Sequence, residues 1–162
     1  MSFGDENYNY IANFIQMADD ALFSSDFTDP QVGWQKYMDI DSFVDWYLIH
    51  EMSKNEDSMF HFSTYMNLQR GGKLKMGPIW DFDIACGNNK GECAETEGLF
   101  IQKRHWFARL WDDDYFRAKV AERWKECRAK IEESFAWIET QADFLEDDAN
   151  LDDKIWQRFG YR

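Results

Sequence analysis

The hydrophobic pattern of this chain changes from a helical to an alternating period in only one region, and this limits the folds that the chain can adopt. Residues 63–68 alternate polar and apolar side chains, residues 70–72 are typical of a turn, and residues 73–76 continue as a returning strand. Apolar residues before and after this region recur at helical spacing. The sequence therefore predicts an α+β fold that is mostly helical and contains one β-hairpin.

Helical spacing predicts the elements on both sides of the hairpin. The predicted helices cover residues 8–23, residues 40–53, a segment from Trp106 onward, residues 138–149 and a short terminal piece at residues 155–159. Asp39 suits the N-cap of the second helix because its side chain can accept a backbone N–H of the first turn. Residues 112–114 are acidic and suit a helix start, where the helix dipole favours negative charge.

The composition indicates a globular chain with one core. The chain has 162 residues, of which 44% are hydrophobic and 18% aromatic, and this favours a single domain over residues 1–162. The formal net charge of -13 argues against a nucleic-acid partner and against an anionic membrane surface. No apolar stretch approaches membrane-spanning length. A metal ion would let such an acidic chain hold a polyphosphate.

Two carboxylates, Asp81 and Asp83, lie one residue apart between the predicted hairpin and a loop rich in Gly and Asn. In an extended segment the period of two would direct both side chains to the same face. Mg²⁺ and Mn²⁺ prefer hard oxygen ligands of this kind, so the pattern predicts a metal site that carries a phosphate. Alternatively, the two carboxylates bond backbone amides of the loop that follows.

The polar break before the hairpin supplies a third acid, Asp57. Phosphoryl transfer needs one carboxylate near the attacking oxygen and another that holds Mg²⁺ against the phosphates. A helix, a polar loop with an acid, a hairpin and an acid–aromatic–acid motif occur in this order in kinase C-terminal lobes. Asp57 would then be the carboxylate near the attacking oxygen, and Asp81 would be the metal ligand. The alternatives are that Asp57 caps a turn, or that the two acids form a glycosidase pair, for which no barrel-like strand repetition is present.

Three ordered blocks of the chain, residues 37–48, 54–57 and 77–88, resemble the spore coat protein H (CotH) kinase family. The resemblance spans roughly residues 33–128 and includes the Trp-Asp-Phe-Asp motif that ends at Asp83. It implies an atypical protein kinase fold, in which this chain corresponds to the C-terminal lobe. It further implies binding of ATP with a divalent metal, and phosphorylation of protein substrates that include spore coat proteins.

The resemblance also implies roles for four residues. Asp57 matches the catalytic-loop aspartate, with Asn55 in support, and Asp81 matches the Mg²⁺ or Mn²⁺ ligand, with Asp83 in support. Asp81 and Asp83 would thereby also bind the ATP cofactor through the metal. Phe62 departs from the kinase pattern because it occupies the position where an Asn usually provides a second metal ligand.

The sequence before Asp57 contains no Gly-rich phosphate loop and no strand Lys paired with a helix Glu. We therefore expect a C-terminal-lobe fragment that is inactive alone, with kinase activity in an intact parent protein. The alternative is a catalytically inactive, pseudokinase-like module for spore-coat or cell-surface assembly, or for carbohydrate or protein binding. Phe62 and the eight Trp residues favour that alternative.

The expected partners and location follow from the same resemblance. They are a protein substrate or a coat or surface protein, with self-association through the exposed face of the lobe, in an extracytoplasmic or cell-surface setting. Cys86 and Cys93 flank the loop after the acidic motif and would form a disulfide in an oxidising compartment or remain free thiols. Trp34, Trp80, Trp106 and Trp111 could stack on sugars, but their in-phase placement favours an interpretation as core or interface residues.

Overall fold

The computed structural model describes residues 4–60 and 62–157, and the chain divides into two compact units. The first unit covers Met1–Arg123 and the second covers Trp124–Arg162. The prediction of one domain over residues 1–162 stays a prediction. His61 and the last residues of the predicted piece at 155–159 lie outside the described residues.

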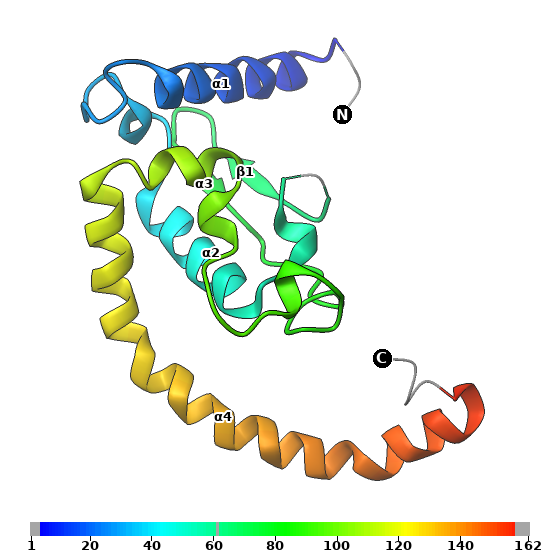
Figure 1. The fold of residues 1–162 in the computed structure, drawn as a ribbon. Helices are drawn as coiled ribbons and strands as arrows, with labels where there is room; N and C mark the ends of the chain where they lie inside the picture. The colour runs from blue at the N-terminus through cyan, green and yellow to red at the C-terminus, as the bar shows by residue number, and fades with distance from the viewer. Residues whose placement is uncertain (1–3, 61, 158–162) are drawn as a thin grey trace. The chain divides into compact units, whose positions relative to one another are not determined.

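The described chain is mostly helical and contains one two-stranded antiparallel sheet (Figure 1). Its helices and strands are α1 (Glu6–Phe23), α2 (Ile40–Ser53), β1 (Met66–Leu68), β2 (Leu74–Met76), α3 (His105–Leu110) and α4 (Asp114–Trp156). Short 3₁₀ turns η1 (Trp34–Lys36), η2 (Glu56–Ser58), η3 (Glu92–Ala94) and η4 (Ile101–Lys103) lie between them. The helical fold with one hairpin is as the sequence predicted.

Acidic caps begin the helices where the sequence indicated. Asp39 accepts a hydrogen bond from the Ser42 backbone N–H at 3.0 Å, so the predicted start of α2 is confirmed. Asp113 accepts the Tyr115 backbone N–H at 2.9 Å at the start of α4. Its other oxygen accepts the Trp34 indole N–H at 2.8 Å, so one buried carboxylate caps a helix and anchors a core residue.

The hairpin pairs Met66 with Met76 and Leu68 with Leu74. Leu74 also forms a parallel bridge with Met38 and thereby ties the hairpin to the segment before α2. The prediction of a strand beginning at residue 63 was wrong. Ser63 has a φ of 48°, in the left-handed region that strand residues do not adopt.

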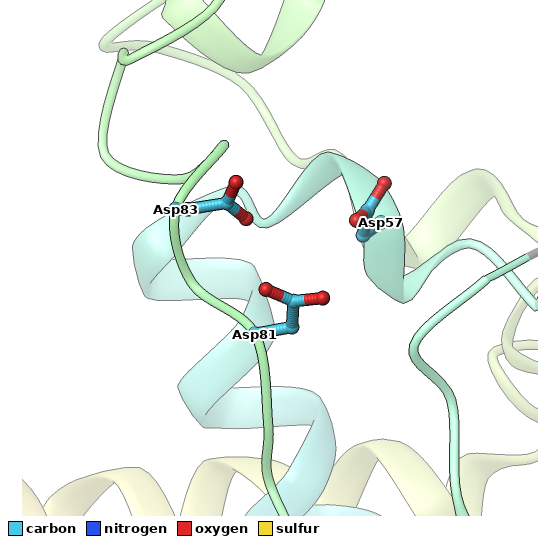
Figure 2. Close-up of side chains that lie close together, drawn as sticks. All are labelled: Asp57, Asp81 and Asp83. Carbon is cyan, nitrogen blue, oxygen red and sulfur yellow. The ribbon is translucent and has the colours of Figure 1, made fainter.

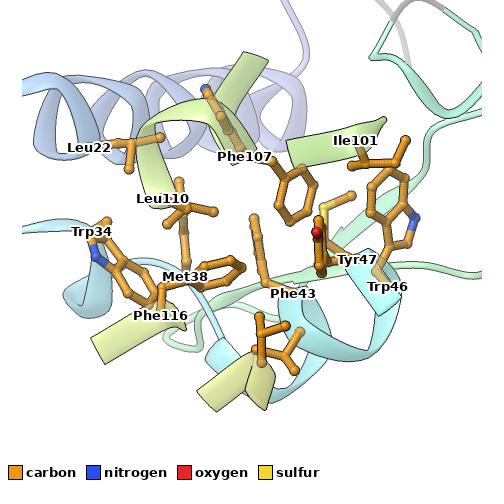
Figure 3. Close-up of a cluster of buried hydrophobic side chains, with 14 of the residues drawn as sticks. Leu22, Trp34, Met38, Phe43, Trp46, Tyr47, Ile101, Phe107, Leu110 and Phe116 are labelled. Carbon is orange, nitrogen blue, oxygen red and sulfur yellow. The ribbon is translucent and has the colours of Figure 1, made fainter. Parts of the chain in front are cut away.

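Aromatic side chains from α2, α3 and the first turns of α4 form the core of the first unit (Figure 3). The Phe107 ring stacks on Trp46 with centroids 5.2 Å apart and an interplanar angle of 4°. Trp34 and Trp106 are buried, as expected for core residues. Trp80 is exposed and is not part of the core, and its role as an interface residue stays a prediction. This core holds α2, whose carboxyl end leads to the acidic cluster described below.

The helix α4 runs without interruption from Asp114 to Trp156, so the predicted separation into several helices was wrong. The segment contains neither Gly nor Pro, and nothing in the backbone chemistry ends the helix earlier. Within the described residues, none of the helices has the length and apolarity to cross a membrane, in agreement with the prediction. Cys86 and Cys93 are free thiols, which excludes a disulfide between them in this structure.

Candidate metal and phosphate site

Three carboxylates, those of Asp57, Asp81 and Asp83, converge at one place on the first unit (Figure 2). One oxygen of each lies within 4.8 Å of the others. Asp57 lies on η2, and the other two lie on the segment that follows β2. Asp57 and Asp81 are half-buried and Asp83 is exposed, so a ligand can reach the cluster from solvent.

Direct hydrogen bonds between two segments, residues 53–58 and 81–86, create this convergence. The bonds run from the Glu56 N–H to the Ile84 carbonyl (3.3 Å), from the Cys86 N–H to the Ser53 carbonyl (2.6 Å) and from Asn55 Nδ2 to the Asp81 carbonyl (2.7 Å). The hairpin returns the chain to residues 53–58, and these hydrogen bonds hold residues 81–86 against them. The acids therefore lie on a backbone scaffold.

Asn55 connects the backbones of two acids. Its side chain is fully buried; Nδ2 donates to the Asp81 carbonyl, and Oδ1 accepts the Asp57 N–H at 3.2 Å. Asn55 was predicted to support the site, and in the structure it is a positioning residue that acts through Asp57 and Asp81. Its role in catalysis stays a prediction.

Asp81 shows that the acids converge by a different geometry from the one predicted. The sequence predicted an extended segment with two side chains on one face, but no strand is assigned to the described residues 77–83. Asp81 has a φ of 62°, in the left-handed region that Asp and Asn tolerate better than most residues. The left-handed backbone of Asp81 and the hydrogen bond from Asn55 to its carbonyl fix the direction of the Asp81 side chain. The extended geometry was therefore wrong, although the two carboxylates do lie close together.

Ser63 is part of the cluster and was not predicted. Its hydroxyl donates to Asp81 Oδ2 at 2.9 Å, and its Oγ lies 3.4 Å from Asp57 Oδ2. The sequence offers one signal for Ser63: it directly follows Phe62, the position at which kinases usually have a second metal ligand. The Phe62 side chain itself is exposed.

His50 lies beneath the acidic segment and was also missed. Its ring is fully buried, stacks on Phe82 with centroids 4.9 Å apart, and lies 4.1 Å from the Trp46 ring. Neither ring nitrogen has a hydrogen-bond partner in the described structure. Burial lowers the pKa of His50 from 6.5 to about 4, so the imidazole is neutral at pH 7. The stack supports Phe82, which lies between Asp81 and Asp83.

The electrostatics of the cluster favour a cation. Among residues 4–60 and 62–157, no Lys or Arg forms an ion pair with any of the three carboxylates. Like charges at this separation repel, and a divalent ion would offset that repulsion. Carboxylate and hydroxyl oxygens are the ligands that Mg²⁺ and Mn²⁺ prefer. The residues present therefore fit a hard divalent cation.

Replacing Asn55 by Ala is expected to destabilise the first unit by about 1–3 kcal/mol, because buried partners lose their hydrogen bonds. Urea denaturation followed by Trp fluorescence measures the change. Asn89 is the matched control: it is exposed, follows the segment 81–86 and donates a hydrogen bond to the Glu56 carboxylate of the segment 53–58. Asn89→Ala should cost less than about 1 kcal/mol. Equal losses in the two variants would contradict the positioning role of Asn55.

Comparison with known proteins gives one match. The family model described as CotH kinase protein matches residues 2–161, nearly the whole chain. Searches of the curated proteins and of the solved structures found no match.

Proposed function

The chain belongs to the CotH kinase family, and we propose that its acidic cluster binds Mg²⁺ or Mn²⁺ with ATP and serves phosphoryl transfer to protein hydroxyls. The observation that carries the proposal is the convergence of Asp57, Asp81 and Asp83 within 4.8 Å. The family suggests a kinase-like protein, and the geometry supplies a place for the metal that kinase chemistry requires.

In this proposal Asp81 and Asp83 hold the metal, and Asp57 accepts the proton of the attacking hydroxyl. The division of roles follows from position, because Asp81 and Asp83 share one segment whereas Asp57 approaches from η2. A metal held by Asp81 and Asp83 would offset the negative charge of the phosphates. Ser63 orients Asp81 through its hydroxyl. The Asn55 side chain bonds to the backbones of both Asp57 and Asp81 and so fixes their positions relative to each other.

The acidic character of the cluster makes nucleotide binding depend on metal. Three clustered carboxylates repel the negatively charged phosphates of ATP. ATP without a divalent ion should therefore bind poorly, whereas ATP with Mg²⁺ or Mn²⁺ should bind and raise the melting temperature. This requirement separates the proposed site from a general nucleotide-binding surface.

A second candidate function is a pseudokinase-like module for coat or cell-surface assembly, or for carbohydrate or protein binding. Phe62 favours it, because an exposed aromatic side chain stands where kinases usually have a second metal ligand. Both versions of the proposal include two further points. The chain corresponds to a kinase C-terminal lobe, and its location is extracytoplasmic or at the cell surface. The family match supports a kinase-like fold, and the location is an expectation that follows from the resemblance alone.

Replacing Asp81 by Asn tests the metal site, because the substitution removes a charge and keeps the size. Calorimetric titration with Mn²⁺ should show binding by the wild type and at least about tenfold weaker binding by the variant. Asp20→Asn is the control, since Asp20 is an exposed acid on α1, and it should leave the affinity unchanged. A wild type that binds no metal, or equal affinity in Asp81→Asn and wild type, would overturn the proposed site.

Transfer of labelled phosphate from ATP to a protein acceptor, measured on an intact parent protein that supplies the nucleotide-binding lobe, separates the two candidate functions. Metal-dependent transfer that is lost in Asp57→Asn, with metal binding retained, supports the kinase. Metal binding with no transfer supports the pseudokinase-like module.

A further inference from the structure

The second unit presents an apolar stripe along α4. The stripe consists of residues spaced three and four apart, namely Trp124, Cys127, Ile131, Phe135, Ile138, Ala142, Leu145 and Ala149. At 3.6 residues per turn these side chains fall in a sector about 80° wide. We call this set the α4 stripe. Its spacing is that of a helix that packs against another helix.

Five of the eight residues of the α4 stripe are exposed, and Cys127, Ile131 and Ala149 are half-buried. Phe135, Ile138 and Leu145 are exposed large apolar residues, whereas Phe116 and Val120, which continue the same spacing toward the start of α4, are buried in the first unit. A single helix in water gains most of its stability from packing of its apolar face. A contiguous apolar face of this kind is typical of an interaction surface.

Charged residues beside the α4 stripe are distributed unevenly along the helix. Residues 124–138 are balanced in charge, with Lys125, Arg128 and Lys130 against Glu126, Glu132 and Glu133. Residues 139–156 are acidic, with Glu139, Asp143, Glu146, Asp147, Asp148, Asp152 and Asp153 against Lys154. A second α4 in parallel orientation would place acids against acids in the later turns. An antiparallel α4 places the charge-balanced residues 124–138 against the acidic residues 139–156 and so avoids that repulsion.

We propose that the α4 stripe is a homodimer interface, in which α4 pairs antiparallel with α4 of a second copy about a two-fold axis near Thr140. This axis brings large residues opposite small or complementary ones. It places Ile131 opposite Ala149, Phe135 opposite Leu145 and Ile138 opposite Ala142. Alternation of large and small side chains lets two helices approach closely. Parallel pairing would place each Ala opposite an identical Ala and leave gaps.

The two-fold axis also predicts which charges meet. A two-fold axis perpendicular to both helices brings the same flank of each α4 to the same side of the interface. Lys130, Asp148 and Asp152 lie on one flank of the stripe, about 240–280° around the helix from Trp124. In the proposed register Lys130 of one copy lies opposite the turn that contains Asp148 and Asp152 of the other. Each dimer contains this contact twice.

Sedimentation equilibrium on the full chain tests the interface with a matched pair of variants. Ile138 is 53% exposed and lies in the stripe, and Leu151 is 56% exposed and lies about 180° around the helix from Trp124. The wild type and Leu151→Asp should be dimers, whereas Ile138→Asp should raise the dimer dissociation constant at least about tenfold. Unchanged circular dichroism verifies that each variant folds. A monomeric wild type, or equal weakening by both variants, would overturn the proposal.

Charge reversal tests the antiparallel orientation. Lys130→Glu should weaken the dimer several-fold, because an acid then faces Asp148 and Asp152. Adding Asp148→Lys should restore the wild-type affinity, since the pair of opposite charges is re-formed. In a parallel dimer residues 130 and 148 lie far apart, so the second substitution would not compensate for the first. Failure of the double variant to recover would overturn the antiparallel arrangement.

Discussion

Replacing Phe107 by Ala is expected to destabilise the first unit by about 3–5 kcal/mol, one of the largest effects that a single core substitution produces. Phe107 is fully buried at the centre of the aromatic core. Its ring contacts Trp46 at 5.2 Å, Tyr47 at 5.6 Å and Phe43 at 6.1 Å between centroids. The loss combines transfer of the ring to water with the cavity that remains, because these rings cannot all close around Ala.

Urea denaturation followed by Trp fluorescence measures the effect, because the first unit contains several of the Trp residues. Phe23→Ala is the control: Phe23 ends α1 and is exposed, so its truncation should change the free energy of unfolding by less than about 0.5 kcal/mol. A loss below about 1 kcal/mol for Phe107→Ala would show that the core repacks around the missing ring.

The elements with clear local signals were predictable from the sequence. The bounds of α2, residues 40–53, agree with the structure because an apolar face and the Asp39 cap indicate the same start. The hairpin was also predictable, since an alternating pattern surrounds a Gly-Gly turn. The strand ends were not, because the φ of Ser63 is set by contacts with residues far along the chain.

The continuity of α4 was missed for a different reason. Residues 138–149 were predicted as a separate helix, although the apolar spacing of the preceding residues continues through Ile131 and Phe135 to Ile138. The composition also favours one continuous helix, because residues 114–156 contain no Gly or Pro. Absence of a stop signal is as informative here as the apolar spacing.

The acids of the candidate site were predictable, but the residues that arrange them were not. Kinase C-terminal lobes place acids in a polar break and after a hairpin, so Asp57, Asp81 and Asp83 stood out, and the structure brings the three together. Ser63 and His50 join them only through tertiary contacts: a hydroxyl bond to Asp81 and a stack on Phe82. Neither residue type carries a sequence spacing that would indicate such contacts.

The second large effect is a loss of stability at acid pH that originates in His50. Its pKa is about 4 in the folded chain because burial disfavours the imidazolium, whereas the ordinary value is 6.5. Between these values the unfolded chain binds more protons than the folded chain, so stability rises with pH over this window. The contribution is fully present above pH 6.5 and is lost as the pH falls toward 4. The shift corresponds to about 3 kcal/mol.

Denaturation at a series of pH values should resolve this contribution through comparison with His50→Phe. Phe keeps an aromatic ring between Trp46 and Phe82 and cannot take up a proton, so the variant should lose the part of the slope that His50 contributes. Carboxylates also titrate near pH 4, but they contribute equally to both proteins and cancel in the difference. His105→Asn provides the control, since His105 is exposed and its left-handed φ of 41° suits Asn. Parallel pH profiles for the wild type and His50→Phe would mean that the folded chain admits the charged imidazole at no cost, which is incompatible with a ring enclosed by Trp46 and Phe82.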